Sequence, residues 1–395
     1  MAAWGLAAII NLSAGAFIAS WPERGSDLNI VREWGYSWLI DGTHIYKGDE
    51  FAPDYPPHAI VALSPIGLLP SPVAPLVWAT LNIGLALLSV HLTVRSIRPG
   101  KTGGDVVVLM LMCLCWGAFR TLLQFSLLTY TFGIAAFRLA DRRPGWSGVC
   151  LGLALMKPQI AAPFVLWAFL TRRIRHLAVA TAVVAGGFAL YAVRARVEPA
   201  RVVADYLDIL RIFYTGGTSG LVGIAQIRPL FARLIADAAR VDLMSGAVSL
   251  LLLAGVCVLG LAERRPPGPP QPHYFAPALA GIWSLLTFFH LTYGFVLLLP
   301  AATLLLLLDH PESRAPRTKI FWVMQALLMF DPPTLWRWFG RWSGLPERLG
   351  AVLLDADRLW MVMLFVAMTV LGWSRVAAER DGRDNREQHG IGGHP

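Results

Sequence analysis

Long apolar blocks separated by short polar stretches run through most of this chain. Inside the blocks, apolar residues follow one another without the alternation of a half-buried strand or the one-sided spacing of a soluble amphipathic helix. Blocks of this kind are typical of helices that cross a lipid bilayer. The pattern predicts apolar segments at 2–20, 58–69, 71–94, 105–119, 125–140, 146–157, 159–171, 177–194, 243–262, 275–290, 293–308, 319–336 and 359–374.

The blocks 146–157 and 159–171 admit two interpretations, because Pro158 separates two segments that are each shorter than a perpendicular span. They form either one helix kinked at the proline or the two limbs of a hairpin. A hairpin places the basic runs at 142–143 and 172–175 on the same side of the membrane. Short basic loops favour the cytoplasmic side, so these charges favour the hairpin.

With this hairpin, the short apolar run 58–69 does not span, and the other blocks predict 10–12 transmembrane helices with both termini in the cytoplasm. The long polar loops at 21–57, 195–242 and 337–358 then all face the extracytoplasmic side. Long loops of this kind often carry function. We therefore expect an all-α polytopic membrane protein whose active site is formed by extracytoplasmic loops.

The composition agrees with a membrane protein. Of 395 residues, 56% are hydrophobic and 15% are charged, whereas soluble domains have about 25% charged residues. We expect residues 1–375 to form one transmembrane domain, and 376–395 to form a disordered cytoplasmic tail. The net charge of +9 comes largely from Lys and Arg at block ends, without a nucleic-acid-binding signature.

Asp27 lies seven residues after the first apolar segment. Near the outer membrane surface, a partly desolvated carboxylate can accept a proton from a hydroxyl group, which is the role of a general base. The alternative is structural, because Ser26 or Asp27 can cap the amphipathic stretch 28–39 as a helix. The residues alone favour the cap.

Asp54, Tyr55 and His58 flank two prolines at the end of the same loop. The prolines fix an extended entry into the short apolar helix that follows. The segment either simply ends the loop at the membrane surface or forms a rigid lip that turns Tyr55 and His58 toward a cavity.

Polar residues interrupt the apolar runs near the outer ends of predicted helices; they are Arg120, Gln124, Lys157 and His290. Ionisable groups at membrane depth are costly and are usually functional. One anionic group, such as a lipid-linked phosphate, would satisfy the three basic residues together. The alternative is that each side chain reaches the interface separately, which is easier for Lys and Arg than for His290.

Several classes of site are absent from the sequence. It has no Walker A motif, no Gly-x-Gly-x-x-Gly and no His-Glu-x-x-His. The four cysteines lie inside apolar blocks and lack the spacing of a zinc site. No internal repeat of the kind that marks a secondary transporter is found. Soluble nucleotide chemistry is therefore not expected.

A further set of landmarks follows one order along the chain. It comprises Asp27, the segment Asp41-Gly-Thr-His-Ile-Tyr-Lys-Gly48, Tyr55-Pro56-Pro57, Leu68-Leu69-Pro70, Gln124, Gly148-x-x-x-Gly152, Lys157-Pro158 and the basic run 172–175. Taken in this order, the landmarks resemble those of the polyprenyl-phosphate-dependent glycosyltransferases of family 87, which have the GT-C architecture. The resemblance covers about residues 1–310, and its most specific pieces are Tyr-Pro-Pro and Lys-Pro.

The resemblance implies a GT-C fold, a polyprenyl-phosphate sugar as donor, and inverting chemistry that needs neither a metal nor a cofactor. Family members carry an essential aspartate after the first span, which corresponds to Asp27 and favours the general base over the cap. The best-known members are actinobacterial mannosyltransferases, so mannose is the favoured sugar. The chain departs from the family pattern at Leu123, which precedes Gln124 in place of glycine, and at His290-Leu-Thr-Tyr293-Gly, which replaces Ser-Trp-x-His-His.

These observations predict a multi-pass cell-membrane glycosyltransferase of envelope biosynthesis, transferring a hexose or pentose to a glycolipid or lipoglycan hydroxyl on the extracytoplasmic face. Membrane lipid is an expected partner and nucleic acid is not. Asp27 is expected to be catalytic. Lys157, Arg120, His290 and Gln124 are expected to bind the donor phosphate, and Asp54, Tyr55, His58 and Tyr293 to bind the sugar or the acceptor. The alternatives are a transporter or flippase of lipid-linked sugars, and a structural subunit.

Overall fold

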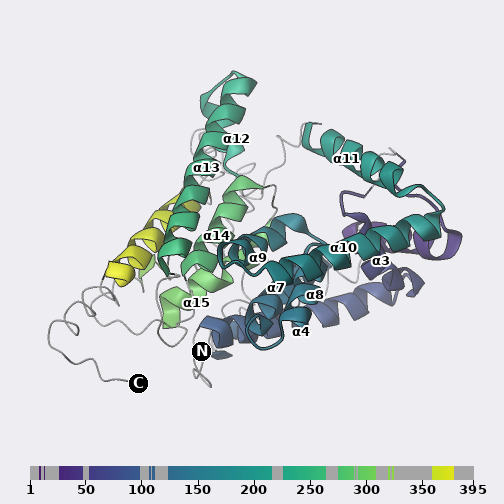
Figure 1. Cartoon of the computed structure of the whole chain (residues 1–395), viewed down its shortest axis with the longest axis horizontal. Helices are drawn as coiled ribbons and strands as arrows, with labels where there is room; N and C mark the ends of the chain where they lie inside the picture. The colour runs from purple at the N-terminus through teal and green to yellow at the C-terminus, as the bar shows by residue number, and fades with distance from the viewer. Residues whose placement is uncertain are drawn as a thin grey trace.

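A computed structural model describes residues 26–47, 53–97, 123–215, 226–263, 275–288, 290, 292–307 and 358–377, with a few isolated positions between them. Every regular element in this part of the chain is a helix. The arrangement is shown in Figure 1. The predicted all-α class is confirmed.

The N-terminal described segment forms two short helical units that cross each other. Helix α2 (Ser26–Tyr36) continues into the π-helical turn η2 (Ser37–Asp41), and α3 (Pro57–Leu63) continues into the 3₁₀ turn η3 (Ser64–Leu68). Both helices were expected from the sequence. The crossing of α2 over η3 is close, because a Cβ added to Gly67 would lie 2.5 Å from the backbone nitrogen of Tyr36.

Five helices form the middle of the molecule. They are α4 (Ala74–Ile97), α7 (Ser126–Leu139), α8 (Pro144–Ala154), α9 (Pro158–Leu170) and α10 (Ile174–Ala195). Each falls on a predicted apolar block with small shifts at its ends. Helix α8 packs against both α7 and α10 (Figure 1).

The pair α8 and α9 is a hairpin, as predicted. The Ser147 hydroxyl, near the start of α8, donates a hydrogen bond to the carbonyl of Ala136 (2.7 Å). Trp167, near the end of α9, packs on Phe137 with ring centroids 4.6 Å apart. The start of α8 and the end of α9 therefore lie at the same end of α7, and Lys157 lies at the other.

Two glycines allow α8 to approach α10 closely. A Cβ added to Gly148 would lie 2.5 Å from Cβ of Val179, and one added to Gly152 would lie 2.6 Å from Cβ of Val183. Glycines four residues apart let helix backbones approach in membrane proteins. The Gly-x-x-x-Gly spacing noted in the sequence is thus a packing motif that fixes the helix leading to Lys157.

The segment 195–242 corrects a prediction. It was expected to be a long polar loop, but it contains α11 (Pro199–Thr215), α12 (Arg228–Leu234) and the beginning of α13 (Ala238–Glu263). Helix α11 forms because its apolar residues recur at helical spacing, with Val202 and Ile209 buried and Arg211 exposed.

The C-terminal half adds α14 (Phe275–Thr287), the 3₁₀ helix η5 (Thr292–Leu298), α15 (Leu299–Leu307) and a last helix, Arg358–Ala377. Helices α13 and α14 run antiparallel. The Glu263 carboxylate, at the end of α13, accepts hydrogen bonds from the backbone nitrogens of Phe275 (3.0 Å) and Ala276 (3.2 Å), and Trp283 Nε1, near the end of α14, donates to the Ser249 carbonyl (3.2 Å) earlier in α13. The last helix ends two residues beyond the predicted domain, and the predicted tail lies outside the described residues from 378 onward.

Four of the described helices are long and apolar enough to cross a membrane; they are Ala74–Ile97, Ile174–Ala195, Ala238–Glu263 and Arg358–Ala377. Shorter apolar helices, including α9 and α14, stand among them. The chain is therefore a polytopic membrane protein. The predicted blocks 2–20, 105–119 and 319–336 and the loop 337–358 lie largely outside the described residues, so the count of 10–12 spans stays a prediction.

Two buried clusters hold these helices together. The first, named here the aromatic core, joins α2, η2, α3, the start of α4, the end of α10 and α11, and includes Trp38, Tyr46, Tyr55, Trp78, Phe125 and Tyr191. The second, named here the bundle core, joins the other helices and is dominated by Leu, Ala, Val and Ile. The residues between 123 and 160 belong partly to each cluster.

Candidate functional site

Lys157 is the centre of a polar cluster where the two cores meet. It is the N-cap residue of α9, with Pro158 as the first helical residue, and only 4% of it is exposed. Its ammonium donates hydrogen bonds to Gln124 Oε1 (3.3 Å) and Ser126 Oγ (3.3 Å). The same ammonium lies 5.4 Å from the centroid of the Tyr55 ring, within the range of a cation–π contact.

Gln124 links Lys157 to Asp27. Its side-chain amide donates a hydrogen bond to the Asp27 carboxylate, while its amide oxygen accepts from Lys157. Its backbone carbonyl accepts hydrogen bonds from Trp78 Nε1 (3.3 Å) and Asn82 Nδ2 (3.0 Å) of α4. These contacts fix the orientation of the amide, with its nitrogen toward the carboxylate and its oxygen toward the ammonium.

Asp27 lies in the first turn of α2, which begins at Ser26, and it is exposed. A carboxylate in the first turn is favoured by the helix dipole. The capping interpretation placed the cap at Ser26 or Asp27, but both residues lie within α2. Its side chain, however, also contacts Gln124, which is 97 residues away in the sequence. The structure therefore joins this carboxylate to the polar cluster and leaves it accessible to a substrate.

Asp54 and Tyr55 form the lip of the cluster. The Tyr46 hydroxyl is buried and donates a hydrogen bond to the Tyr55 carbonyl (2.6 Å), which fixes this turn. Burial raises the pKa of Asp54, and the nearby charge of Lys157 opposes that rise. Asp54 and Tyr55 thus both lie near Lys157.

Burial also affects the two basic residues of the site. It lowers the pKa of Lys157 to about 8, while the charges of Asp54 and Asp27 act in the opposite direction. Burial and the charge of Lys157 lower the pKa of His290 to about 3. At neutral pH, Lys157 is therefore largely cationic and His290 is neutral.

His290 lies next to the hairpin apex. It is buried, and its Nε2 lies 3.3 Å from the hydroxyl of Ser284, which in turn donates a hydrogen bond to the Gln159 carbonyl (2.6 Å). His290 Nδ1 is buried and has no hydrogen-bond partner among the described residues. Because the Ser284 hydroxyl donates its hydrogen to Gln159, a neutral His290 carries its proton on Nε2 and donates it to Ser284 Oγ, which leaves Nδ1 as an acceptor.

His58 is not brought to the cluster. Its ring stacks on Phe188 of α10 with centroids 6.1 Å apart, and a Cβ added to Gly187 would lie 2.4 Å from His58 Cβ. His58 therefore packs α3 against α10. Arg120 lies outside the described residues, and so does the side chain of Tyr293.

The structure adds residues that sequence reasoning did not single out. Ser126 contacts Lys157, Asn82 holds Gln124, Ser284 holds His290, and Tyr46 holds Tyr55. Ser126 and Ser284 are hydroxyl residues inside apolar blocks, which is a weak signal. Tyr46 lies in the segment 41–48, whose pattern was noticed without a role for any one side chain.

The cluster offers an exposed carboxylate, an oriented amide and a buried cation in one row. A carboxylate can take a proton from a hydroxyl, and a preorganised cation can stabilise developing negative charge. Within the described part of the chain, no group of three or more His, Cys, Asp or Glu residues is arranged to hold a metal ion.

Comparison with known proteins gives one match. A family model described as glycosyltransferase family 87 matches residues 54–287, more than half of the chain. The matched region contains Asp54, Tyr55, Gln124 and Lys157, whereas Asp27 and His290 lie outside it. No curated protein and no solved structure matches the chain.

Proposed function

The chain belongs to glycosyltransferase family 87 and is a membrane glycosyltransferase. We propose that its sugar donor is a polyprenyl-phosphate sugar and that the sugar transferred is mannose. The acceptor is a hydroxyl group of a glycolipid or lipoglycan. The observation that carries this proposal is the row Asp27–Gln124–Lys157, in which one oriented amide separates a carboxylate from a buried ammonium.

The reaction uses the two ends of this row. Asp27 takes the proton of the acceptor hydroxyl, whose oxygen forms a bond to the anomeric carbon of the sugar. The bond between that carbon and the phosphate oxygen breaks, and polyprenyl phosphate leaves with the electron pair. Because a phosphate is a stable anion at neutral pH, no general acid is needed, and a cation must stabilise the developing charge.

The placement of the two groups supports inversion at the anomeric carbon. In a direct displacement, the attacking oxygen and the leaving oxygen lie on opposite sides of that carbon. The base contacts the nitrogen of the Gln124 side-chain amide, and the phosphate-binding cation contacts the oxygen of the same amide. A sugar placed along this row therefore has its acceptor hydroxyl near Asp27 and its phosphate near Lys157.

The remaining predicted roles follow from the same placement. Gln124 positions Lys157 at the phosphate site through its amide oxygen, His290 is proposed to line that site, and Arg120 is proposed to add a second cation there. Asp54 and Tyr55 form the lip through which the acceptor sugar enters, and Tyr293 is proposed to contact the sugar. For His58, the packing against Phe188 supports a role in holding α3 rather than in binding.

We place the site on the extracytoplasmic face of the cell membrane. In support, Lys157, Ser126 and Ser284 lie at corresponding ends of their helices, while the basic residues Arg142 and Arg173 lie at the opposite ends. Single cysteines at Glu33 and Arg175, both exposed positions, test this in a background without the four native cysteines. An impermeant maleimide added to intact cells should label the cysteine at 33 and not the one at 175; the reverse result would invert the orientation.

The activity is tested with purified protein in detergent or vesicles. The protein is incubated with a glycolipid acceptor and either polyprenyl-phosphate mannose or polyprenyl-phosphate arabinose, and released polyprenyl phosphate is measured. We expect release that depends on the acceptor and is greater with the mannose donor. Transfer from a nucleotide sugar alone would contradict the proposed donor, and movement of donor across vesicles without release would indicate a flippase.

A further inference from the structure

A basic surface lies at the end of the bundle opposite to the polar cluster. It is formed where the turn that joins α7 to α8 meets the turn that joins α9 to α10. The two turns lie side by side, because Arg173 forms an ion pair with Asp141 (2.6 Å) and His176 Nε2 lies 3.1 Å from the Ala140 carbonyl oxygen. The exposed arginines here, named the arginine surface, are Arg138, Arg142, Arg143, Arg172 and Arg175.

The positive charge of the arginine surface is not balanced by the chain itself. Asp141 is the only acidic residue between 123 and 195, and it pairs with Arg173. Within the described part of the chain, the five arginines of the surface form no ion pair. A guanidinium group binds a phosphate group through two parallel hydrogen bonds, so this excess of arginine favours a phosphate ligand.

Two helices begin at the arginine surface. Their N-cap residues are Arg143 for α8 and Arg173 for α10, and neither forms a side-chain hydrogen bond that caps the helix. Arg175 lies in the first turn of α10. The helix dipole favours an anion at this end of a helix and disfavours a cation. An anion bound among these arginines therefore stabilises both the side chains and the two helix ends.

Arg172 occupies a backbone position that favours glycine. Its φ is 54°, and the hydrogen bonds from Arg172 N to the Phe169 carbonyl (3.0 Å) and from Arg173 N to the Ala168 carbonyl (2.8 Å) end α9 in a Schellman motif. A side chain at positive φ is strained, which is why glycine is usual there. The Arg172 guanidinium forms no hydrogen bond with another described residue. The side chain thus costs stability without supporting the fold, which indicates a ligand outside the chain.

Apolar side chains border the arginine surface. Trp146 near the start of α8, Phe169 in the last turn of α9 and Ile174 at the start of α10 are 63%, 69% and 73% exposed. Tryptophan is enriched where a membrane protein passes from hydrocarbon to headgroups. These side chains therefore place the neighbouring arginines at the level of the lipid headgroups.

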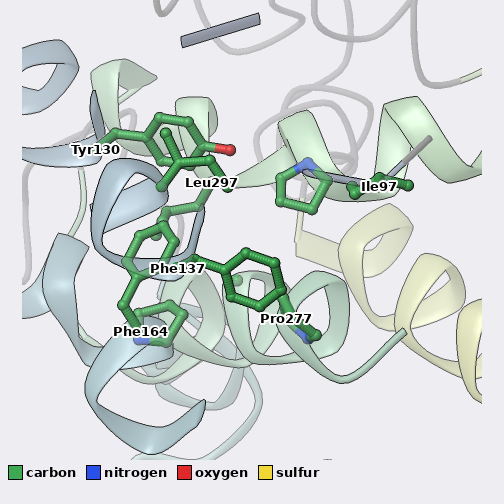
Figure 2. Close-up of a pocket in the computed structure, with 10 residues that line it drawn as sticks. Ile97, Tyr130, Phe137, Phe164, Pro277 and Leu297 are labelled. Carbon is green, nitrogen blue, oxygen red and sulfur yellow. The ribbon is translucent and has the colours of Figure 1, made fainter. Parts of the chain in front are cut away.

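The protein is closely packed beneath the arginine surface. The Arg173 guanidinium lies 5.4 Å from the centroid of the Trp167 ring, and Trp167 packs on Phe137 with ring centroids 4.6 Å apart. Phe137 borders a cavity of about 10 Å³, which Figure 2 shows together with Phe164 and the other lining residues. This volume is at the lower limit for one water molecule. A ligand of the arginines must therefore bind on the outside of the bundle.

We propose that the arginine surface binds the phosphate headgroups of anionic phospholipids in the adjacent leaflet, with Arg172 as one of the binding residues. Clusters of cations at the ends of membrane helices attract such headgroups. The inside-positive bias of membrane proteins does not by itself account for Arg172, because Arg173 and Arg175 beside it already satisfy that bias. The inference is independent of the proposed activity, since the surface lies at the far end of the hairpin from Lys157. In the orientation proposed above, the leaflet is the cytoplasmic one.

The test measures the melting temperature of the full-length protein in a neutral detergent as phospholipid is added. We expect phosphatidylglycerol to raise the melting temperature in a concentration-dependent manner, because a ligand of the folded state stabilises it. Phosphatidylcholine with the same acyl chains should have little effect, and high salt should reduce the effect of phosphatidylglycerol. Water-soluble glycerol phosphate is the third addition. An equal rise with phosphatidylcholine would overturn the proposed headgroup, and an equal rise with glycerol phosphate would mean a site for free phosphate instead of lipid.

Two variants with the same backbone change give a matched comparison. Arg172→Gly removes one guanidinium of the arginine surface and relieves the strained φ. Arg196→Gly makes the same change at the opposite end of α10, where Arg196 is also exposed, has φ 54° and ends its helix with hydrogen bonds to the Val193 (3.2 Å) and Ala192 (3.0 Å) carbonyls. Without lipid, both variants should melt at or above the temperature of the unaltered protein.

Only Arg172→Gly should change the response to phosphatidylglycerol. Its half-maximal concentration should rise about fivefold, and that of the combined variant Arg142→Gln, Arg143→Gln and Arg172→Gly about a hundredfold, since each arginine near a headgroup contributes about the same free energy. Arg196→Gly should keep the unaltered value. Equal values for all of these proteins would overturn the proposal, and so would an equal loss in Arg196→Gly. A lipid-free Arg172→Gly that melts below the unaltered protein would show that the guanidinium supports the fold itself, which would overturn the assignment of Arg172.

Discussion

The two cores of this protein are built by different means. In the aromatic core, directional hydrogen bonds join separate segments: Trp38 Nε1 donates to the Tyr191 carbonyl (3.2 Å), and the Arg194 guanidinium donates to the Leu39 carbonyl (2.8 Å). In the bundle core, a few hydroxyl pairs join neighbouring helices, such as Ser89 with Thr131 (2.7 Å), while Thr303 and Thr369 bond to carbonyls four residues back in their own helices. There, contacts between helices are mostly made by aliphatic side chains and glycine.

Hydrogen bonds between segments and aliphatic packing serve different purposes in the two cores. Directional bonds between segments can hold a carboxylate or an ammonium at a set position, whereas aliphatic packing supplies a medium similar to the lipid around it. The polar cluster lies at the boundary, since Phe125 and Met156 belong to the aromatic core and Leu127 and Ile160 to the bundle core.

The largest expected effect follows from removing the Asp27 carboxylate, which lies on the aromatic-core side of the polar cluster. Asp27→Asn keeps the shape and the hydrogen bond from Gln124 but removes basicity, so transfer should fall by at least about a hundredfold. Because Asp27 is exposed, thermal stability should be retained. Glu33→Gln on the same helix, also exposed, is the control and should keep normal turnover. Near-normal transfer by Asp27→Asn would make Asp54 the next candidate base.

Removal of the buried cation should have the next largest effect. Lys157→Gln should lower kcat/KM for the donor about 10- to 150-fold, through the loss of charge-assisted hydrogen bonds of about 1.5–3 kcal/mol. With a pKa of about 8, Lys157 is charged below that pH. Donor affinity should therefore fall as pH rises through 8.

The control for this prediction is Lys47→Gln, which removes an exposed charge from the neighbouring loop. It should leave both the donor KM and its pH dependence unchanged. A pH profile that is the same in the unaltered protein and in Lys157→Gln would show that another group binds the phosphate.

A third prediction tests the contact between the aromatic core and α10. Gly187→Ala places a methyl group 2.4 Å from His58 Cβ and 2.9 Å from its Cα, so unfolding free energy should fall by about 1–3 kcal/mol. The adjacent Gly186→Ala meets no atom within 4 Å and should be neutral or slightly stabilising. Melting temperatures in one detergent give the comparison; equal values for the two variants would contradict the placement of α3.

The smallest expected effect concerns the hydroxyl that holds the lip. Tyr46→Phe leaves the Tyr55 carbonyl without this donor, so stability should fall by about 0.5–1.5 kcal/mol and the donor KM should rise several-fold. The pH profile assigned to Lys157 should shift, because the Tyr55 ring lies against its ammonium. Ser147→Ala removes a comparable hydroxyl-to-carbonyl bond in the bundle core and should affect stability alone. A pH profile unchanged by Tyr46→Phe would separate Tyr46 from the site.

Much of the fold could be predicted from the sequence because the apolar blocks are long and their order is simple. The hairpin followed from basic runs on both sides of two short blocks, and Lys157 was prominent because it interrupts an apolar stretch. Helix α11 was missed because its apolar residues are spaced on one face and interrupted by charge, so the segment reads as polar on average.

The sequence alone determined that the chain spans a membrane, where its helices lie, and which charged residues interrupt apolar runs, because these depend on local composition and on the cost of burying charge. Only the tertiary structure decided which of those residues meet. It brought Asp27, Gln124 and Lys157 into one row, directed His58 to Gly187 and Phe188, and joined the turns before α8 and α10 into one basic surface. Such contacts join residues far apart along the chain, and they depend on how closely helices approach, which local pattern does not encode.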